Sequence, residues 1–563
     1  MTKSLFLGIQ INSVMKFRLP FAVSVALLVA LSASAAKPKT ASSLVWGSTD
    51  IRYSKTEAPA ALKAPALRAW RGERVFAQAV FRADKDCSIS FSVSDFKSGK
   101  NIIPSRYVTK AFVGYVLTDN YNGTDRAAQL VADRLDNTES AEVKAGENQP
   151  LWLDIKVPDS AVPGKYSARL TVNCNGATIS LPISLTVVNR MLPEPENWKF
   201  HLDLWQNPYA VARYFNVPLW SQEHFDVMRP IMERYAKAGG KVITASIMQH
   251  PWNCQTHDPF ESMIAKFKHI DGSWQYNYEV FDKWVAFMMS CGVTEQIDCY
   301  TIVPWGYTFE YYDMATASMK TFSCQPQDKE YEEYMLPFLT DFARHLRAKR
   351  WFYKTCIAMD ERPMDQLRTA RAILHQADPE FRIQGATDYS PEVVDIMHDI
   401  SVAYQYVNLP DAVVEQRNRD GMVTTFYTCC GPERPNTFTF SPAAESTFIP
   451  LHAASLGLSG YLRWAYNSWT TDPCADSRHD IRDWHGGDCY LVYPEGSSIR
   501  FDRLIQGIQD YEKIRILRED CSSDSVMTAR IKALLEPFKP SRFDTLDAAA
   551  LVNAFEAGLS GLD

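Results

Sequence analysis

The stretch KTCIAMDERPMDQL (354–367) ends an apolar run on two adjacent carboxylates, Asp360 and Glu361. Burying one carboxylate is costly, and a second one beside it disfavours charge on the first. General acid catalysis uses carboxyl groups whose protonation is shifted in this way by burial and by neighbours. The plain structural alternative is a capped or salt-bridged strand end, with Arg362 as the ionic partner.

Cleavage of a glycosidic bond is a reaction that uses two such groups, one to protonate the leaving oxygen and one to stabilise the oxocarbenium-like centre. Neighbours in an extended strand point to opposite sides, so Asp360 and Glu361 are poorly arranged to flank a sugar from both faces. They suit a substrate whose own 2-acetamido carbonyl oxygen attacks the anomeric carbon. One carboxylate, charged, then orients the amide, and the other, protonated, is the acid and later the base. This chemistry requires no metal and no other cofactor.

The elements that would position the pair are eight apolar, strand-like runs separated by stretches with helical apolar spacing, such as 221–240, 278–292, 331–350 and 364–378. The runs are 200–205, 241–248, 296–303, 355–361, 382–388, 400–407, 422–429 and 457–466. This alternation predicts a (β/α)8 TIM-type barrel with long insertions, in which chemistry gathers at the carboxyl ends of the strands. A doubly wound open sheet is the alternative, although no glycine-rich nucleotide motif follows any of the runs.

Polar and aromatic residues follow the other predicted strands, where they would meet the pair at the barrel mouth. We expect a sugar-binding pocket made of Tyr427, Trp464, Trp469, His250, Trp252, Gln206, Asn207, Trp205, Asp388 and Trp484. Tyr427 could bond the acetamido carbonyl, and Trp464 and Trp469 could wall its methyl group. Simpler roles stay open, because Asn207 could cap a helix, Trp205 could pack inside the barrel, and a lone histidine is more often structural.

The chain before the barrel has a different pattern, with short alternating or β-branched runs at 73–83, 88–96, 150–157, 166–174 and 177–188. Turn-forming residues separate them, so residues 37–190 are predicted to form a β-sandwich domain. We assign 191–198 to a linker, 199–515 to the catalytic barrel and 516–563 to a short helical C-terminal segment. Residues 1–36 are predicted to be a signal peptide, because Lys16 and Arg18 precede a short apolar run that ends in small residues.

Composition narrows the classes of partner. The 563 residues carry a net charge of −7, which argues against nucleic acid and anionic membranes as partners. No segment after residue 36 is apolar enough to span a membrane, so we expect an exported protein, periplasmic or secreted. The 12 cysteines show neither a disulfide framework nor zinc-site spacing, although Cys474 and Cys489 could pair. Neither HExxH nor GxSxG occurs, which disfavours metallopeptidases and serine hydrolases.

The pattern of motifs resembles glycoside hydrolase family 123. The resemblance rests on LDLWQNPYAVARYF (202–215), AMDERP (358–363), YTCCGPERPNTF (427–438), GYLRWAYNSW (460–469) and IQDYEKIRIL (508–517). It implies a retaining, exo-acting β-N-acetylgalactosaminidase on terminal β-linked N-acetylgalactosamine, with Asp360 as the acetamido-stabilising residue and Glu361 as the general acid and base. The substrate-assisted hexosaminidases of family 20 share the adjacent pair but usually have His and Gly just before it, whereas this chain has residues 356–359 as CIAM.

Two other functions stay open from the sequence. A β-N-acetylglucosaminidase would use the same pair, since its sugar differs only at C4. A non-catalytic carbohydrate-binding surface protein is the alternative outside enzymes, and the intact acidic pair argues against it. The aglycone and the oligomeric state cannot be derived from the residues.

Overall fold

The computed structural model describes residues 41–121, 128–540 and 546–562. The predicted signal peptide, 1–36, lies outside these described residues. None of the described helices is long and apolar enough to cross a membrane. The 12 cysteines all lie in the described part of the chain and are free thiols, so Cys474 and Cys489 do not form the disulfide considered above.

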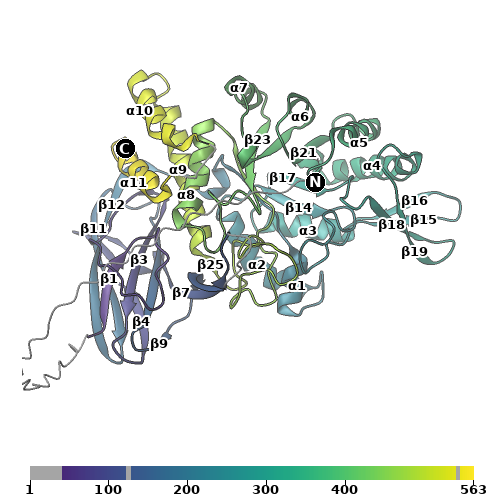
Figure 1. Cartoon of the computed structure of the whole chain (residues 1–563). Coiled ribbons are helices and arrows are strands. Elements are labelled where there is room, and N and C mark those ends of the chain that lie inside the picture. Colours follow the sequence, from purple (N-terminus) through teal and green to yellow (C-terminus); the bar gives the residue numbers. More distant parts are fainter. Residues whose placement is uncertain (1–40, 122–127, 541–545, 563) are drawn as a thin grey trace, which may run out of the picture. The chain divides into compact units, whose positions relative to one another are not determined.

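The N-terminal region is β-rich and contains two sheets (Figure 1). The first has the order β1 (Ser43–Gly47), β3 (Arg74–Arg82), β10 (Asn148–Lys156), β7 (Val108–Thr118), β8 (Gln129–Asp136) and β25 (Ser497–Ser498). The second has the order β2 (Ala66–Arg71), β12 (Ala177–Met191), β11 (Gly164–Cys174), β4 (Cys87–Val93) and β9 (Ala141–Val143). Strand β5 (Phe96–Ser98) also pairs with β11, and β6 (Asn101–Ile103) pairs with β5. Every second residue of β4 is buried, as the alternating sequence requires, and both sheets contribute to one apolar cluster.

Two buried contacts join this region to the part of the chain that follows the barrel. Strand β25 pairs with β8, although more than 350 residues separate them. The helix α9 (Ile499–Asp520) then places Arg500 Nε 3.0 Å from Asp133 Oδ2, and both side chains are fully buried. Removing one partner of such a pair would leave an uncompensated buried charge, so the contact fixes the start of α9 against β8.

The second region contains a nearly closed barrel of eight parallel strands (Figure 1). Around the barrel the strands are β13 (His201–Leu204), β24 (Gly460–Arg463), β23 (Val423–Thr428), β22 (Asp399–Ala403), β21 (Arg382–Thr387), β20 (Thr355–Ala358), β17 (Gln296–Tyr300) and β14 (Val242–Ser246). A parallel bridge between Leu202 and Gly240 and a 3.0 Å bond from Lys241 N to Leu202 O bring β13 and β14 together. Each strand coincides with one of the eight predicted runs, although β22 begins one residue before its run, and the ring-like order excludes a doubly wound open sheet.

Helices follow the barrel strands, as the helical apolar spacing predicts. They are α1 (Pro208–Phe215), α2 (Gln222–Ala236), α3 (Glu279–Ser290), α4 (Lys329–Lys349), α5 (Met364–Ala377), α6 (Pro391–Ile396), α7 (Asp411–Arg419), α8 (Ala443–Leu456), α9, α10 (Ser525–Leu535) and α11 (Ala548–Leu559). Short 3₁₀ turns occur at Ser105–Tyr107, Pro195–Asn197, Phe352–Lys354, Tyr404–Tyr406 and Glu536–Phe538. Helix α9 continues to Asp520, past the predicted boundary at 515/516.

The insertions that follow β14 and β17 form a sheet of their own, which the sequence patterns did not predict. Its order is β16 (Trp274–Asn277), β15 (Ala265–Lys268), β18 (Thr308–Asp313) and β19 (Ser318–Ser323). The residues of β19 alternate between half-buried and exposed, and those of β16 do the same. Such half-exposed strands lack the continuous apolar run that identified the barrel strands.

Candidate active site

The acidic pair lies just beyond the carboxyl end of β20, whose four residues are all buried. Glu361 N donates a 2.9 Å hydrogen bond to Ala386 O, which belongs to the neighbouring strand β21. The backbone of Glu361 has a φ of 48°. This left-handed conformation is uncommon for a residue with a side chain, and such strain gathers at functional sites. The turn gives the two carboxylates different surroundings, because Asp360 is only 7% exposed whereas Glu361 is exposed.

Asp360 is the member of the pair that is hard to charge in the unliganded site. Burial raises the pKa of Asp360 well above its usual range, and the neighbouring Glu361 raises it further. Arg362 and the indole N–H groups of Trp252 and Trp305 act in the opposite direction. Trp305 Nε1 donates a 3.2 Å hydrogen bond to the backbone oxygen of Asp360, whereas Trp252 Nε1 has no hydrogen-bond partner among the described residues. The sequence analysis expects Asp360 to be charged in the reaction, and its burial opposes that charge in the unliganded site.

Tyr427, at the end of β23, contacts the other carboxylate. Its hydroxyl donates a 2.8 Å hydrogen bond to Glu361 Oε1. Tyr427 is otherwise buried, with only 7% of its surface exposed. Burial raises the pKa of Tyr427 above its usual value, and the nearby Glu361 raises it further, so the hydroxyl stays protonated. The geometry thus joins Tyr427 to Glu361, whereas the sequence suggested a contact with a substrate carbonyl.

A cavity of about 610 Å³ opens over the pair, within the range of about 300–1,000 Å³ typical of small-molecule sites. Its aromatic lining consists of Trp205, Trp252, Phe260, Trp305, Tyr427, Trp464 and Trp484. The rings of Trp205 and Trp252 stack with centroids 4.8 Å apart, and Trp464 meets Trp484 edge-on at 5.9 Å. Aromatic faces of this kind suit the C–H faces of a sugar ring.

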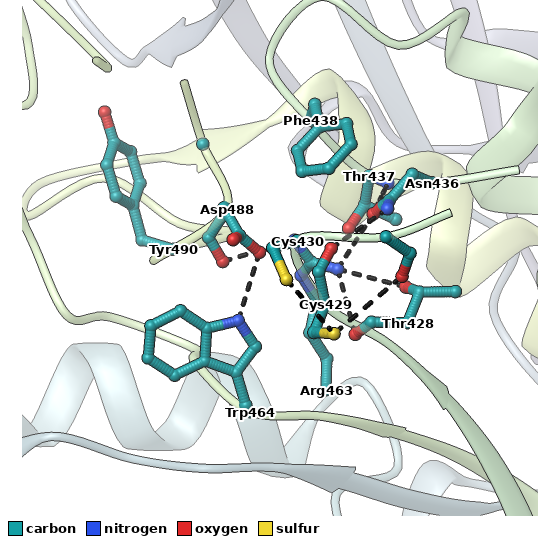
Figure 2. A network of polar contacts seen from close by, with 12 residues as sticks. Thr428, Cys429, Cys430, Asn436, Thr437, Phe438, Arg463, Trp464, Asp488 and Tyr490 are labelled. Atoms are coloured by element: carbon teal, nitrogen blue, oxygen red, sulfur yellow. Dashed lines mark hydrogen bonds and ion pairs between the residues drawn. The ribbon is translucent and has the colours of Figure 1, made fainter. Parts of the chain in front are cut away.

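A buried polar network supports one wall of the cavity (Figure 2). Arg463 Nη2 lies 2.8 Å from Asp488 Oδ1, with both side chains fully buried, and Trp464 Nε1 donates a 3.0 Å hydrogen bond to the same oxygen. This contact fixes the Trp464 ring at the cavity. Sequence reasoning did not single out Arg463, which lies inside a strand, or Asp488.

His250 lies at the cavity as predicted, on the segment after β14. Its Nδ1 lies 2.9 Å from the Sγ of Cys254, and its backbone N–H donates a 2.8 Å hydrogen bond to Phe260 O. The sequence did not single out the thiols of the lining, which are Cys254, Cys429 and Cys430. Only the YTCC motif pointed to the last two.

Two predicted pocket residues after β13 lie in the barrel wall instead. Gln206 is fully buried, and its Oε1 accepts a 3.0 Å hydrogen bond from Thr244 N. Asn207 is also fully buried and caps α1, because its Oδ1 accepts a 3.1 Å hydrogen bond from Ala210 N. These side chains shape the start of α1, and neither lines the cavity.

Two further predicted residues do not reach the cavity. Trp469 is fully buried, donates a 2.8 Å hydrogen bond to Val492 O and packs edge-on against Tyr214 at 5.4 Å. Asp388 is exposed and lies outside the cavity lining. Both residues follow barrel strands, as the sequence indicates. Their place in the sequence did not predict the direction of their side chains.

No group of three or more His, Cys, Asp or Glu residues is arranged to hold a metal ion within residues 41–121, 128–540 and 546–562. The cavity lining offers carboxylates, a phenol, an imidazole, thiols and aromatic faces as its chemical groups.

Two family models match the chain. The model described as "Glycoside hydrolase 123, catalytic domain" matches residues 205–517, and the "Glycoside hydrolase 123 N-terminal domain" matches residues 46–174. No curated protein matches the chain.

Solved structures include a family 123 glycoside hydrolase from Clostridium perfringens, described in connection with glycolipid glycan hydrolysis. It is 25% identical, with a TM-score of 0.85, over 92% of this chain and 98% of that one. A β-glucuronidase from Bacteroides uniformis is 10% identical, with a TM-score of 0.29, over 80% of this chain and 51% of that one.

Proposed function

We propose, from the premise that the chain belongs to glycoside hydrolase family 123, that it is an exo-acting, retaining β-N-acetylgalactosaminidase. Membership of this family makes the protein a glycoside hydrolase. The proposed substrates are glycans or glycolipids that end in β-linked N-acetylgalactosamine. The similar Clostridium perfringens enzyme, which is described in connection with glycolipid glycans, supports this substrate class.

The observation that carries the proposal is the unequal environment of the two neighbouring acids. Asp360 is buried at the cavity floor, and Glu361 is exposed to the cavity and hydrogen-bonded by Tyr427. Both acids leave the same strand end, so they are poorly arranged as a nucleophile and an acid on opposite faces of one sugar. A substrate that brings its own nucleophile needs only one acid at the leaving oxygen and one carboxylate at its amide.

In the proposed reaction, the acetamido carbonyl oxygen attacks the anomeric carbon while Glu361 donates its proton to the glycosidic oxygen. The bond between the anomeric carbon and the aglycone oxygen breaks, and a cyclic oxazolinium ion forms. Water then attacks the anomeric carbon, and the bond between that carbon and the acetamido oxygen breaks, which restores the acetamido group. The Glu361 carboxylate takes the proton that this water releases. Two displacements at one carbon return it to its original configuration, which makes the reaction retaining.

Asp360 would act on the amide during these steps. Its burial disfavours the charged form in the free site, as the direction of its pKa indicates. The amide N–H of the substrate offers a hydrogen bond to that carboxylate, and the oxazolinium ion adds a positive charge beside it. The Asp360 charge is thus stabilised more in the transition state than in the free enzyme, which is the condition for catalysis.

The remaining parts of the proposal concern the surroundings of the site. The stacked Trp205 and Trp252 rings, with Trp464 and Trp484, are the proposed stacking surfaces for the sugar and its acetamido methyl group. We propose that the N-terminal β-rich region is a sandwich that braces the barrel. We also propose that a short helical segment follows the barrel at the C-terminal end of the chain. Export to the periplasm or beyond is proposed from residues 1–36 alone.

Hydrolysis of 4-nitrophenyl β-glycosides tests the proposal. We expect turnover of the N-acetylgalactosaminide, weaker turnover of the N-acetylglucosaminide and almost none of the galactoside, which lacks the amide. Proton NMR of the first product should show the β-anomer. Turnover of none of the three would favour a non-catalytic carbohydrate-binding protein, and an α-anomer as first product would exclude the proposed mechanism.

A further inference from the structure

The glycine pair Gly486–Gly487, in the segment WHGGDCY (484–490), is a feature of the sequence that the proposed reaction does not use. Trp484 and Asp488, which flank this pair, both line the active-site cavity. Asp488 also accepts the 3.0 Å hydrogen bond that fixes the Trp464 ring (Figure 2). The position of the glycine pair therefore determines where two aromatic surfaces of the cavity lie.

Gly486 packs against the N-terminal β-rich region, at the residues where strand β7 ends. Its backbone N–H donates a 2.8 Å hydrogen bond to Oδ1 of Asp119, a fully buried side chain. A Cβ atom at position 486 would collide with Thr118 Oγ1 and would lie 2.8 Å from Ser477 Oγ. Because only glycine lets the backbone approach β7 this closely, the contact accounts for the glycine at this position.

Asp119 also contacts the residue before Gly486. Its Oδ2 lies 3.3 Å from Nδ1 of His485. The ring of Tyr121, two residues after Asp119, packs on the imidazole of His485 with ring centroids 4.8 Å apart. The end of β7 and the residues directly after it thus hold the first half of the turn at two successive positions, 485 and 486.

The second half of the turn is attached to β7 through another segment. Leu117 N donates a 2.8 Å hydrogen bond to Ala475 O, and Ser477 N donates one of 2.8 Å to Leu117 O, which forms a parallel bridge at the end of β7. Gly487 N then donates a 3.2 Å hydrogen bond to Ser477 O. The glycine pair is therefore fixed to the N-terminal region directly through Asp119 and indirectly through Ser477.

Other buried contacts attach the N-terminal region to the rest of the chain away from the cavity lining. Gln509 of α9 is fully buried, accepts a 2.8 Å hydrogen bond from Arg74 N and donates one of 2.8 Å to Arg74 O. Neither residue lines the cavity. Strand β25 also pairs with β8. Loss of the Asp119 carboxylate would therefore leave the N-terminal region attached and would release the turn beside the cavity.

We propose that Asp119 is a positioning residue for the sugar-binding wall formed by Trp464 and Trp484. It acts through the Gly486–Gly487 turn and touches no substrate. The inference rests on the proposed function, which makes this wall a stacking surface for the sugar. A buried carboxylate is costly unless hydrogen bonds compensate it, so the Gly486 N–H and Asp119 hold each other in place. The N-terminal region thereby contributes to the affinity for the terminal sugar, beyond bracing the barrel.

Steady-state kinetics on 4-nitrophenyl β-N-acetylgalactosaminide test this role. Asp119→Ala removes the acceptor of the Gly486 N–H and should raise KM about 3- to 10-fold, which is the range that weaker stacking on an aromatic ring allows. The value of kcat should stay within about twofold, because such stacking binds the ground state and the transition state alike. Asp119→Asn keeps an acceptor oxygen and should return KM to nearly the wild-type value.

The matched control is Gln509→Ala, which breaks a buried contact of the same region with the rest of the chain away from the cavity lining and should leave KM unchanged. Equal KM values in Asp119→Ala and Gln509→Ala would overturn the proposal. A loss of kcat with unchanged KM in Asp119→Ala would overturn it as well, because the wall would then not act on sugar binding.

Hydrogen–deuterium exchange gives a second readout that needs no activity. Asp119→Ala and Gly486→Ala should both increase exchange in the peptides that cover residues 477–490, whereas Gln509→Ala should leave those peptides unchanged. Unchanged exchange in this segment in either folded variant would refute the positioning role. If exchange rises as expected but the wild-type chain does not hydrolyse the N-acetylgalactosaminide, the proposed function fails and the positioning of the wall by Asp119 stands, so the two failures are distinguishable.

Discussion

Replacing Tyr427 by Phe removes one hydroxyl from the active site and keeps the buried ring. The lost contact is the 2.8 Å hydrogen bond to Glu361 Oε1. Glu361 becomes charged as it gives up its proton in the first step, and a hydrogen bond to a charged group contributes about 1.5–3 kcal/mol. About 1.36 kcal/mol corresponds to a factor of ten in rate. We therefore expect kcat to fall about 10- to 150-fold on substrates that need the acid, with a smaller change in KM.

The leaving group separates two roles for this hydroxyl. If Tyr427 orients Glu361, Tyr427→Phe should lose more activity on an alkyl N-acetylgalactosaminide than on the 4-nitrophenyl one, which departs with little protonation. If it instead bonds the acetamido carbonyl, both substrates should lose activity equally, and that result would refute the reasoning from the unliganded geometry. Tyr404→Phe is the matched control, because that buried hydroxyl donates to Pro540 O at 3.2 Å and lies outside the cavity lining.

Three further variants test the acids and one structural residue. Glu361→Gln should lose about 10²- to 10⁴-fold in kcat on alkyl glycosides and less on aryl glycosides, whereas Asp360→Asn should lose comparably on both; wild-type rates in either variant would contradict the assignment. The raised pKa of Asp360 means that the folded state binds more protons than the unfolded state above about pH 4, so stability falls as pH rises through the folded pKa. Asp360→Asn should therefore raise the free energy of unfolding in urea by about 0.5–2 kcal/mol at neutral pH and leave it unchanged below about pH 4. An equal gain in the free energy of unfolding at both pH values would refute this. Asn207→Ala should lower the free energy of unfolding by about 0.5–2 kcal/mol with kcat unchanged, and a specific loss of kcat would return Asn207 to the pocket.

The barrel was predictable from sequence because its strands are buried on both faces. Strand β14 reads VITAS and strand β23 reads VTTFYT, and such runs stand out between helical stretches. The sheet β16–β15–β18–β19 was not predictable in the same way, because its strands are short and half-exposed. Helix boundaries were wider in the sequence than in the structure, as with α2, which ends at Ala236.

The site was predictable to the level of strand ends but not of side-chain direction. Asp360 and Glu361 stood out because two adjacent acids after an apolar strand are costly. Asn207 and Trp469 also follow strands, yet one turns to cap α1 and the other packs into the core. The raised pKa of Asp360 and the φ of 48° at Glu361 are features that no sequence pattern indicated.

The nucleophile is the central claim, and a series of 4-nitrophenyl N-acetylgalactosaminides with zero, one, two or three fluorines on the acetyl methyl group tests it most directly. Each fluorine withdraws electrons from the amide oxygen and leaves the rest of the sugar unchanged. If that oxygen attacks the anomeric carbon, kcat/KM should fall steeply along the series. A flat series would mean that a group of the protein or a water molecule attacks instead, and would contradict the account.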